Sequence, residues 1–353
     1  MDTHDRKVID VLSDQKRFIV PFYQRHYKWD EKLWSSFWED VRVKAEEALN
    51  QRPKFDHYMG ALILSPESYS VAVTPRLLIV DGQQRLTTFQ LFLIALREVG
   101  ERLGYADISE AIQNYLFNNP MSGDSGQDAK FKLVPNRADR ALFFKLADCG
   151  LAFLREEKNG WFYKNGRIIK KYAPNAVRAV DYFEHYIYQF CKAGYVDSDV
   201  SAIDQNSANP DDEDANSVYY RINALLNALL NHLKLVVITL DENDDAQVIF
   251  ETLNSKSEPL NAMELVRNNI FQRASAESEH AEKLFEEKWK PLEEPFWHEF
   301  APRARPQRPR IDHFLSHTLT AQTGDEVSLR ELYAEYRAFA QPKGKQRFSS
   351  VEE

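Results

Sequence analysis

Five consecutive residues, Asp81-Gly82-Gln83-Gln84-Arg85, place a carboxylate, two amides and a guanidinium around one glycine. They follow the apolar run 77–80 and precede a run with helical periodicity, so they stand where a strand passes into a helix. Such a junction offers an anion the free N–H groups and the positive dipole end of the helix. The side chains could add a water, a metal ion or a positive charge to a bound phosphate.

Each of these residues has a role in an interpretation based on phosphoryl transfer. Asp81 could hold a divalent metal ion or orient a water, and Gly82 lets the backbone turn sharply close to a phosphate. Gln83 or Gln84 could position the attacking water, and Arg85 could neutralise charge that develops on the transferred oxygens. A structural alternative stays open, because Asp81 and Gln84 have the spacing of a capping box that would start the helix without any function.

A second cluster, Pro21-Phe22-Tyr23-Gln24-Arg25-His26-Tyr27-Lys28-Trp29, is rich in aromatic and cationic residues. If the segment is extended, Tyr23, Arg25, Tyr27 and Trp29 share one face. That face could stack a base or hold a phosphate beside a hydrophobic surface. The alternative is a core strand whose rings fill the space beneath a sheet.

Two basic segments are candidates for contacts to a DNA backbone. One is an expected β-hairpin at 161–170, with Asn165-Gly166 as a two-residue connection. The other is a proline-spaced arginine run at 302–310. Structural alternatives are a hairpin that caps a helical region and a solvated linker. The candidate residues are Lys164, Arg167 and Lys170 in the hairpin and Arg303, Arg305 and Arg308 in the run.

Composition narrows the class of protein. The 353 residues carry a formal charge of −9, so a DNA contact needs local basic patches. Two cysteines are too few for a disulfide scaffold or a four-cysteine zinc site. His313 and His317 have metal-ligand spacing but no evident third ligand, so we predict no metal site there. A charged N-terminus and the lack of an 18-residue apolar run predict a cytoplasmic protein with no membrane span.

The strands and helices expected around these residues indicate an α+β protein. We expect strands at 18–22, 58–64, 71–80 and 235–240. Helices are expected from Asp30 to about Leu49 and directly after the 81–85 segment, and a further helix is expected to be capped by Asn261 and Glu264. The acidic stretch 201–216 is predicted to be a mobile loop. The expected domains are a core at 1–104 plus 232–273, a mainly helical insertion at 105–231, a C-terminal helical region at 274–345 and the start of a linker at 346–353.

The motifs and their order resemble a known family. Residues 19–29, Tyr58-Met59-Gly60 and 79–88, followed by 250–260 and Leu265-Val266-Arg267-Asn268, are similar to the DGQQR-motif family. These are ParB/sulfiredoxin-like nucleotide-hydrolysing domains at the N-terminus of GmrSD-type modification-dependent restriction proteins. Within the family, the chain looks closest to the SspE-type members, which respond to phosphorothioate-modified DNA and hydrolyse GTP.

This resemblance implies a small mixed sheet with helices, hydrolysis of GTP or another NTP with Mg²⁺ as a candidate ion, and sensing of modified double-stranded DNA in bacterial defence. It also implies a C-terminal HNH nuclease domain that has no counterpart in this sequence. Lys256-Ser257 replace an Arg-Gly that is frequent in the family, so we expect a different turn beside Asn254. The implied residues are a hydrolytic set of Asp81, Gln83, Gln84 and Arg85, nucleotide contacts at Gly82, Thr87 and Asn254, and modified-DNA contacts at Pro21, Tyr23, Gln24, Arg25 and Tyr27.

Two other functions remain open from the sequence. The chain could be a DNA-binding regulatory module that senses a nucleotide without hydrolysing it, or an enzyme that cleaves DNA itself. The sequence contains no G-x-x-x-x-G-K-[ST], G-x-G-x-x-G or G-x-S-x-G motif, so a nucleotide would be bound without the common phosphate loops.

Overall fold

The computed structural model describes residues 1–51, 55–67, 70–157, 160–192, 210–241, 244, 249, 261–276, 280–301, 307–342 and 347–348. The chain packs as two compact units. Unit 1 comprises Met1–Pro21 and His26–Asp244, and unit 2 comprises Phe22–Arg25 and Asp245–Glu353. This division by packing falls at different positions from the domain boundaries given above, which stay a prediction.

Unit 1 is built on a six-stranded mixed sheet with the strand order β1-β6-β3-β4-β2-β5. Pairing is antiparallel for β1 with β6 and for β3 with β4, and parallel for the other neighbours. The α+β class is therefore confirmed, and β6 lies in the same sheet as the strands from the first 81 residues. The strands are β1 (Asp2–Lys7), β2 (Arg17–Ile19), β3 (His57–Pro66), β4 (Arg76–Asp81), β5 (Leu133–Val134) and β6 (Leu233–Thr239).

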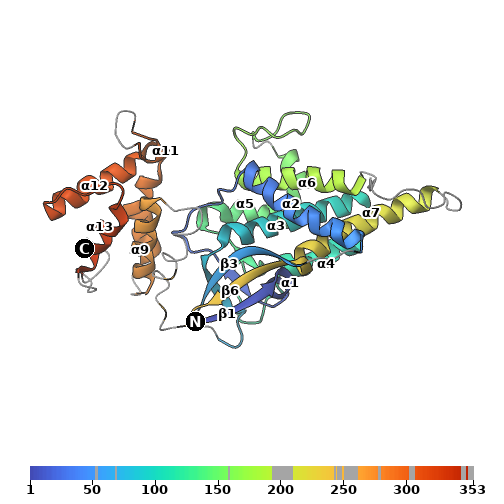
Figure 1. Ribbon diagram of the computed structural model, residues 1–353, viewed down its shortest axis with the longest axis horizontal. Coiled ribbons are helices and arrows are strands. Elements are labelled where there is room, and N and C mark those ends of the chain that lie inside the picture. Colours follow the sequence, from blue (N-terminus) through green and yellow to red (C-terminus); the bar gives the residue numbers. More distant parts are fainter. Residues whose placement is uncertain are drawn as a thin grey trace. The chain divides into compact units, whose positions relative to one another are not determined.

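Helices lie over the sheet of unit 1 (Figure 1), and α3 is the central one. Its apolar residues are buried on all sides, including Phe89 and Leu91–Leu96, as its sequence predicts. Asp30 caps α2 by accepting hydrogen bonds from the N–H groups of Lys32 and Leu33. The helical elements are α1 (Val8–Leu12), α2 (Glu31–Leu49), α3 (Gln83–Leu103), α4 (Ala106–Leu116), α5 (Arg137–Glu156), α6 (Asn175–Lys192), α7 (Pro210–Asn227) and the π-helical turn η1 (Ala228–His232).

Three local predictions for unit 1 are wrong. The strand expected from 71 begins at Arg76, and the strand expected to reach 22 ends at Ile19. Residues 210–216, the second part of the expected acidic loop, are helical. Proline and acidic residues also favour the first turn of a helix. Residues 201–209 lie outside the described residues.

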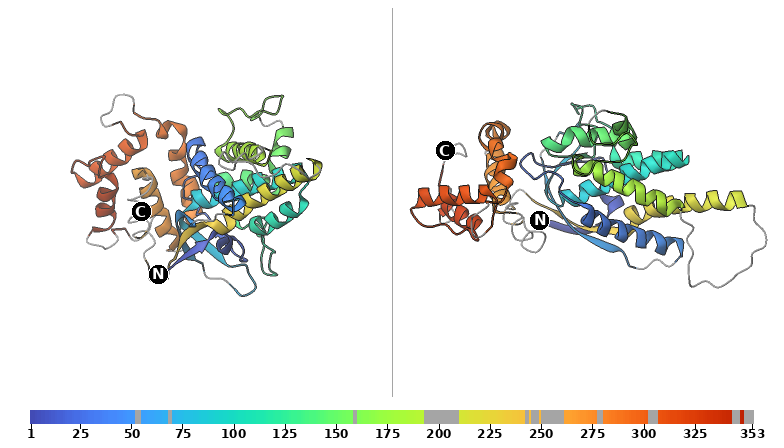
Figure 2. Two further views of the ribbon diagram at one scale, coloured as in Figure 1. Left: turned by 45° about the vertical axis from the view of Figure 1, so that its right-hand side comes forward. Right: turned by 90° about the horizontal axis from the view of Figure 1, so that it is seen from above.

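The expected hairpin exists but is shorter, and its turn differs. Phe162 and Ile168 form a single antiparallel bridge. Tyr163 N donates to Arg167 O at 2.8 Å, so three residues rather than two connect the arms. A two-residue type I′ turn needs a positive φ at both central positions, and here only Gly166, at +77°, has one. The segment 160–173, called the hairpin below, projects from the helices in Figure 2 (green).

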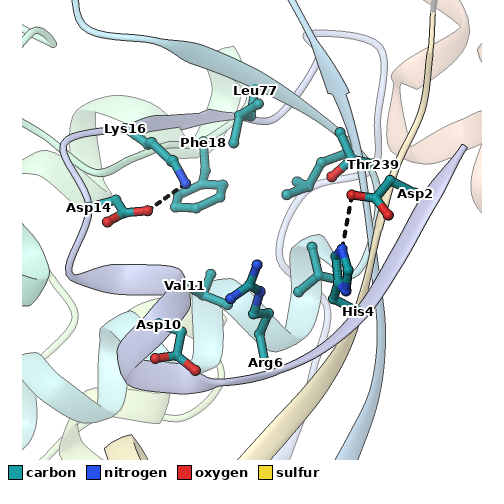
Figure 3. Close-up of a pocket in the computed structure, with 12 residues that line it drawn as sticks. Asp2, His4, Arg6, Asp10, Val11, Asp14, Lys16, Phe18, Leu77 and Thr239 are labelled. Atoms are coloured by element: carbon teal, nitrogen blue, oxygen red, sulfur yellow. Dashed lines mark hydrogen bonds and ion pairs between the residues drawn. The ribbon is translucent and has the colours of Figure 1, made fainter.

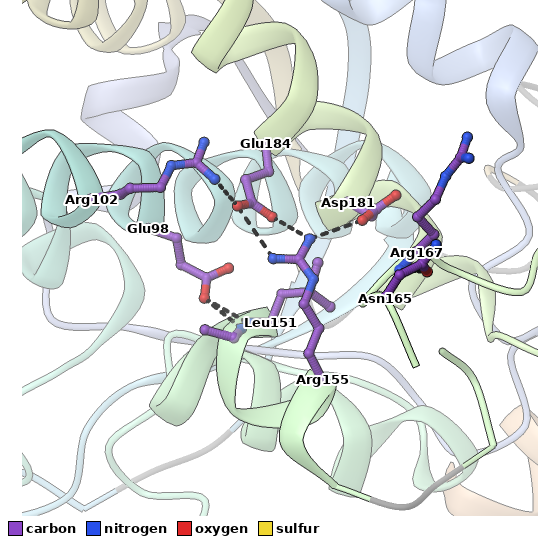
Figure 4. Close-up of polar contacts among 9 residues, drawn as sticks. Glu98, Arg102, Leu151, Arg155, Asn165, Arg167, Asp181 and Glu184 are labelled. Carbon is purple, nitrogen blue, oxygen red and sulfur yellow. Dashed lines mark hydrogen bonds and ion pairs between the residues drawn. The ribbon is translucent and has the colours of Figure 1, made fainter. Parts of the chain in front are cut away.

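A polar network around the buried Glu184 joins α3, α5 and α6 (Figure 4). Arg155 donates to Asp181 at 2.9 Å and to Glu184 at 2.8 Å, and Arg102 donates to Glu184 at 2.7 Å. Glu98 accepts from the N–H groups that follow the α5 kink at Gly150, and burial raises the pKa of its carboxyl group. The network fixes α6 and the direction of Asp181.

Unit 2 is helical in its described part. One core contains Met263, Val266, Phe271, Trp289 and Ile311, and Phe22 and Tyr23 pack against it. The described helices of the chain include none that is long and apolar enough to cross a membrane. The elements of unit 2 are α9 (Ala262–Ala276), α10 (Ala281–Leu284), the π-helical turn η2 (Phe285–Trp289), the 3₁₀ turn η3 (Lys290–Glu293), α11 (Pro295–His298), α12 (Arg310–Thr323) and α13 (Leu332–Ala340).

The predicted cap of α9 is confirmed. Asn261 Oδ1 accepts from Glu264 N at 2.8 Å, and Glu264 Oε2 accepts from Asn261 N at 3.2 Å. The two side chains therefore form the reciprocal capping box expected from their spacing.

Candidate nucleotide site

The turn between β4 and α3 is made by Gly82 and not by a capping box. Gly82 is the N-cap residue with φ +97°, and no side chain caps the helix. The alternative in which Asp81 and Gln84 only start the helix is wrong, because the side chain of Gln84 bonds elsewhere. The first N–H groups of α3 are therefore left without a side-chain cap, and Asp81 ends the strand directly before them.

A bend in β3 holds Arg85 against this turn. Arg85 Nη1 donates to Ala61 O at 2.7 Å. Gly60, at φ +102°, leaves the space that the guanidinium occupies, since a Cβ there would be 3.1 Å from Arg85 Cζ. A Cβ on Gly82 would be 2.9 Å from the same Ala61 O, so the guanidinium lies beside the 81–83 turn. Two glycines with positive φ thus bring β3, the turn and Arg85 together.

Gln84 holds the start of the 26–30 segment of unit 1. Its Oε1 accepts from Lys28 N at 2.8 Å, and its Nε2 donates to His26 O at 3.1 Å. The side chain is 8% exposed. Because both ends of the amide are occupied by backbone groups, Gln84 positions residues 26–28 rather than a water.

The other motif residues differ in their burial and in whether their side chains have bonding partners. Within the part of the chain that the structure describes, neither Asp81 nor Gln83 makes a side-chain hydrogen bond or ion pair, and both are half-buried. Thr87 is 7% exposed and faces the interior of unit 1. Asp81 and Gln83 are therefore the polar side chains of the motif that remain available to a ligand.

The extended conformation considered for residues 23–29, as a shared aromatic face or as a core strand, is wrong. These residues form a turn followed by irregular chain, not a strand. Tyr27 is 5% exposed, and its hydroxyl group accepts from Trp34 Nε1 at 2.9 Å and bonds Thr88 Oγ1 at 2.8 Å. Burial raises its pKa. Tyr27 is thus a core residue of unit 1, and Pro21 is also buried there.

Tyr23, Gln24 and Arg25 belong to unit 2. Arg25 Nη1 lies 4.0 Å from Glu264 Oε2. Asn268 Nδ2 donates to the carbonyl groups of Tyr23 and Glu264, at 3.2 Å each, in the amide orientation that satisfies both ends. These contacts fix the segment against α9. The roles proposed for the three residues at a nucleotide or a modified backbone stay predictions.

The remaining predicted residues lie outside the described residues, in unit 2 or in the hairpin. Asn254, Arg303 and Arg305 lie outside the described residues, as does the second family signature at 250–260. Arg308 is half-buried in unit 2, where burial raises the pKa of Asp312 and the charge of Arg308 opposes that shift. Lys164 and Arg167 are exposed, and in the described structure their charged ends contact no acidic group. Lys170 pairs with Glu31 at 2.7 Å.

A pocket of about 290 Å³ opens on the sheet beside β1 and α1 (Figure 3). Its apolar wall includes Phe18, Leu77 and Val237, and polar contacts join His4 to Asp2 at 3.0 Å and Lys16 to Asp14 at 2.6 Å. Three carboxylates balance its cations, so it does not favour a phosphate by charge. None of the predicted site residues lines it.

Sequence reasoning missed what holds the motif in place. Tyr58-Met59-Gly60 enters the analysis only through the family resemblance, although Gly60 makes the room for Arg85. Its position in a strand, where glycine is unfavourable, is a signal of close approach that could have identified it. Ala61 contributes only its carbonyl group, so its residue type carries no signal.

The adjacent glutamines should behave differently when replaced. Gln84→Ala removes two hydrogen bonds to the backbone of residues 26–28, each worth about 0.5–1.5 kcal/mol, so it should lower the free energy of unfolding by about 1–3 kcal/mol. Gln83→Ala is the matched control, because its half-buried amide has no partner within the described residues, and its stability should be unchanged. Urea unfolding of both variants measures this. Equal stabilities would contradict the positioning role of Gln84.

No group of three or more His, Cys, Asp and Glu side chains that could hold a metal ion occurs among the described residues. His313 and His317 have ring centroids 6.4 Å apart on α12. An ion at the 81–85 segment would therefore have Asp81 as its protein ligand and would need the phosphates of a substrate for the rest of its coordination.

Comparison with known proteins identifies the family. The family model of the N-terminal domain of GmrSD restriction endonucleases matches residues 8–271. A comparison with curated proteins gives no match. The matched range contains β2 to β6, the 81–85 segment, the hairpin and most of α9. The chain therefore belongs to the GmrSD restriction endonuclease N-terminal domain family and is part of a restriction system.

Proposed function

We propose that this chain is a nucleoside triphosphatase that senses modified DNA and regulates a nuclease domain of the same restriction system. GTP is the substrate favoured by the resemblance to SspE-type proteins, and the ParB/sulfiredoxin-like assignment of the core is part of the same proposal. The observation that carries it is the start of α3, where N–H groups without a side-chain cap, a fixed guanidinium and two available polar side chains occur together.

Each part has a defined chemical task. The α3 N-terminus would bind phosphate oxygens through backbone N–H groups, which Gly82 allows to approach closely. Arg85 keeps Nε and Nη2 without hydrogen bonds to described residues, so it can stabilise charge on the transferred phosphoryl group. Gln83 would orient the attacking water. Gln84, which the resemblance places in the hydrolytic set, would act by holding residues 26–28.

The residues present fit a Mg²⁺ ion bound together with a nucleotide. Asp81 is a carboxylate with no protein partner in the described structure, and Mg²⁺ is commonly held by one or two carboxylates plus substrate phosphates. When bound, the ion would neutralise charge on the phosphates.

Modified DNA is the proposed regulator, with a phosphorothioate as the modification. Sulfur is larger than oxygen and more weakly hydrated, so an aromatic surface beside a guanidinium would favour it over a plain phosphate. Tyr23 and Arg25 are the candidates for such a pair in unit 2, where Tyr23 packs with Phe22 and Arg25 lies 4.0 Å from Glu264. Tyr27, buried in unit 1, would support this segment without contacting the DNA.

A phosphate-release assay tests this function. We expect turnover of GTP above that of ATP, CTP and UTP, and a change in rate when phosphorothioated duplex is added but not when plain duplex of the same sequence is added. Absence of turnover with all four nucleotides, with and without either DNA, would show that the motif does not hydrolyse NTPs. Equal affinity for the two duplexes would remove the sensing part.

A further inference from the structure

A small pocket lies between the hairpin, the start of α2 and one side of α6. Its volume is about 180 Å³. The hairpin contributes Ile168 and Lys170 to its lining. The other lining residues are Glu31 and Trp34 from α2 and Arg178, Asp181, Tyr182, His185 and Tyr186 from α6. This pocket is separate from the 81–85 segment and contains Lys170, for which the sequence predicts only a DNA-backbone contact.

The lining suits a planar base. Tyr182 and Tyr186 pack with ring centroids 4.5 Å apart, and His185 lies against Tyr186 at 5.2 Å. Rings of this kind stack nucleobases. Glu31 and Asp181 each use one oxygen, for Lys170 and Arg155 respectively, and the other oxygen makes no hydrogen bond with described residues. A free carboxylate oxygen accepts a hydrogen bond from the exocyclic amino group of cytosine or adenine.

The surface around the pocket suits the strand that carries such a base. Lys164, Arg167 and Lys171 are exposed on the hairpin and have no acidic partner in the described structure. Tyr163 and Tyr172 are 58% and 61% exposed beside them. Cations interleaved with exposed rings on a protein of net charge −9 mark a local nucleic-acid surface.

Two hydrogen-bonded routes within unit 1 connect this pocket to α3. In the first, Arg178 donates to Asn175 Oδ1 and Asn175 Nδ2 donates to Lys28 O, each at 3.2 Å. Lys28 N then donates to Gln84 at 2.8 Å. Each residue on this route is hydrogen-bonded to its neighbour, so a shift of Arg178 would move residues 26–28 and the first turn of α3.

The second route starts from Trp34, which lines the pocket. Trp34 Nε1 donates to the Tyr27 hydroxyl group at 2.9 Å, and that group bonds Thr88 Oγ1 at 2.8 Å. Thr88 Oγ1 in turn donates to Gln84 O at 2.8 Å. Both routes therefore end at Gln84, next to Gln83 and Arg85.

We propose that this pocket binds one unstacked base of a DNA strand, with an exocyclic amino group, and that its occupation is coupled to the nucleotide site through residues 26–34. The coupling rests on the proposed function, whereas the binding of the base does not. DNA with an unpaired base would be bound more tightly than fully paired DNA, because the paired duplex must first lose stacking and pairing energy.

The binding part is tested without nucleotide by fluorescence anisotropy on a duplex with one bulged cytosine, the fully paired duplex and the single strand. We expect the bulged duplex and the single strand to bind about tenfold more tightly than the paired duplex. Tyr186→Leu, which keeps apolar bulk, should abolish this preference. Lys170→Ala, a change at an exposed site, should reduce it. Equal affinity for bulged and paired DNA in the unmodified protein would overturn the proposal.

Matched controls separate the pocket from general effects. Tyr220→Ala removes a tyrosine that is 61% exposed on α7, and Arg6→Ala removes an exposed arginine of β1 without an ion-pair partner in the described structure. Both should keep the preference for bulged DNA. Lys164→Ala with Arg167→Ala should weaken all three DNAs alike and reduce the salt dependence of binding. A preference kept by Tyr186→Leu but lost by Tyr220→Ala would also overturn the proposal.

The coupling part is tested with a non-hydrolysable GTP analogue, so hydrolysis is not required. Bulged DNA should change the affinity for the analogue by at least about fivefold, and the analogue should change DNA affinity by the same factor. Asn175→Ala interrupts the first route and Thr88→Val the second, so the double variant should remove this factor while each ligand alone binds within about twofold of its usual affinity. A factor that persists in the double variant overturns the coupling. An analogue that does not bind at all contradicts the proposed function, and the anisotropy series still decides on the pocket.

Discussion

Replacement of Arg85 by alanine is expected to lower NTP turnover at least about 100-fold, because the guanidinium is the one permanent cation of the motif. Its position is set by Ala61 O on one side and Gly60 beneath it, so loss of the side chain leaves a gap that no neighbouring cation of the motif fills. Arg85→Lys should recover little of the rate, since a lysine cannot bond Ala61 O and contact a phosphate with the same planar group. Phosphate release at saturating nucleotide measures both variants.

Arg42→Ala on α2 is the control for this experiment. Arg42 is also partly exposed, and it pairs with Glu39 and Glu46 on the same helix. Its loss should leave turnover unchanged and affect stability only slightly, as is usual for surface pairs. If Arg85→Ala turned over NTP at the rate of the Arg42 variant, the guanidinium would have no part in catalysis and the 81–85 segment would be a structural turn.

Much of the fold could be predicted because local patterns act over short distances. The Asp30 cap, the Asn261 and Glu264 capping box and the apolar α3 are all confirmed, since each depends on residues within a turn or two. The conformation of residues 23–29 could not be predicted correctly. Alternation implies a strand there, but the chain passes between two packing units at these residues and takes an irregular path.

For the site, the sequence identified the candidate residues but could not show which of them hold the backbone and which are available to a ligand. The 81–85 segment contains two identical glutamines, and only the structure shows that Gln84 is used for the backbone at residues 26–28 while Gln83 has no described partner. The capping-box interpretation is wrong for a related reason. It assumes that Gln84 turns back to its own helix, whereas long-range contacts determine its direction.

The same limit applies to the pocket beside the hairpin. In the sequence, Tyr182, His185 and Tyr186 have the spacing of one side of an amphipathic helix, and nothing there places them next to Lys170 or Glu31. Their meeting depends on the packing of α6 against α2 and on the Arg155 contacts that fix Asp181. Residues that are far apart in sequence and carry no motif of their own can therefore form a ligand pocket that only the structure shows.

Gly82→Ala should have the largest effect on stability of any single change at the motif. An alanine at φ +97° is strained, and its Cβ would be 2.9 Å from Ala61 O and 3.0 Å from Leu62 Cδ1. Gly104, at the other end of α3, has φ +85°, and a Cβ added there would meet no atom within 4 Å, so Gly104→Ala reports the strain alone. We expect a loss of about 1–2 kcal/mol for Gly104→Ala, and about 1–3 kcal/mol more for Gly82→Ala.

Gly60→Ala should affect NTP turnover more than it affects the free energy of unfolding. Its φ of +102° carries a similar strain, but the new Cβ would meet the Arg85 side chain, at 3.1 Å, rather than backbone. A flexible side chain can move, so the free energy of unfolding should fall by no more than in Gly104→Ala, while turnover should fall toward the level of Arg85→Ala. Urea unfolding and phosphate release on the three glycine variants test this together. Normal turnover in Gly60→Ala would mean that the guanidinium is not held in its working position by β3, which would leave the α3 N-terminus alone to bind the phosphates.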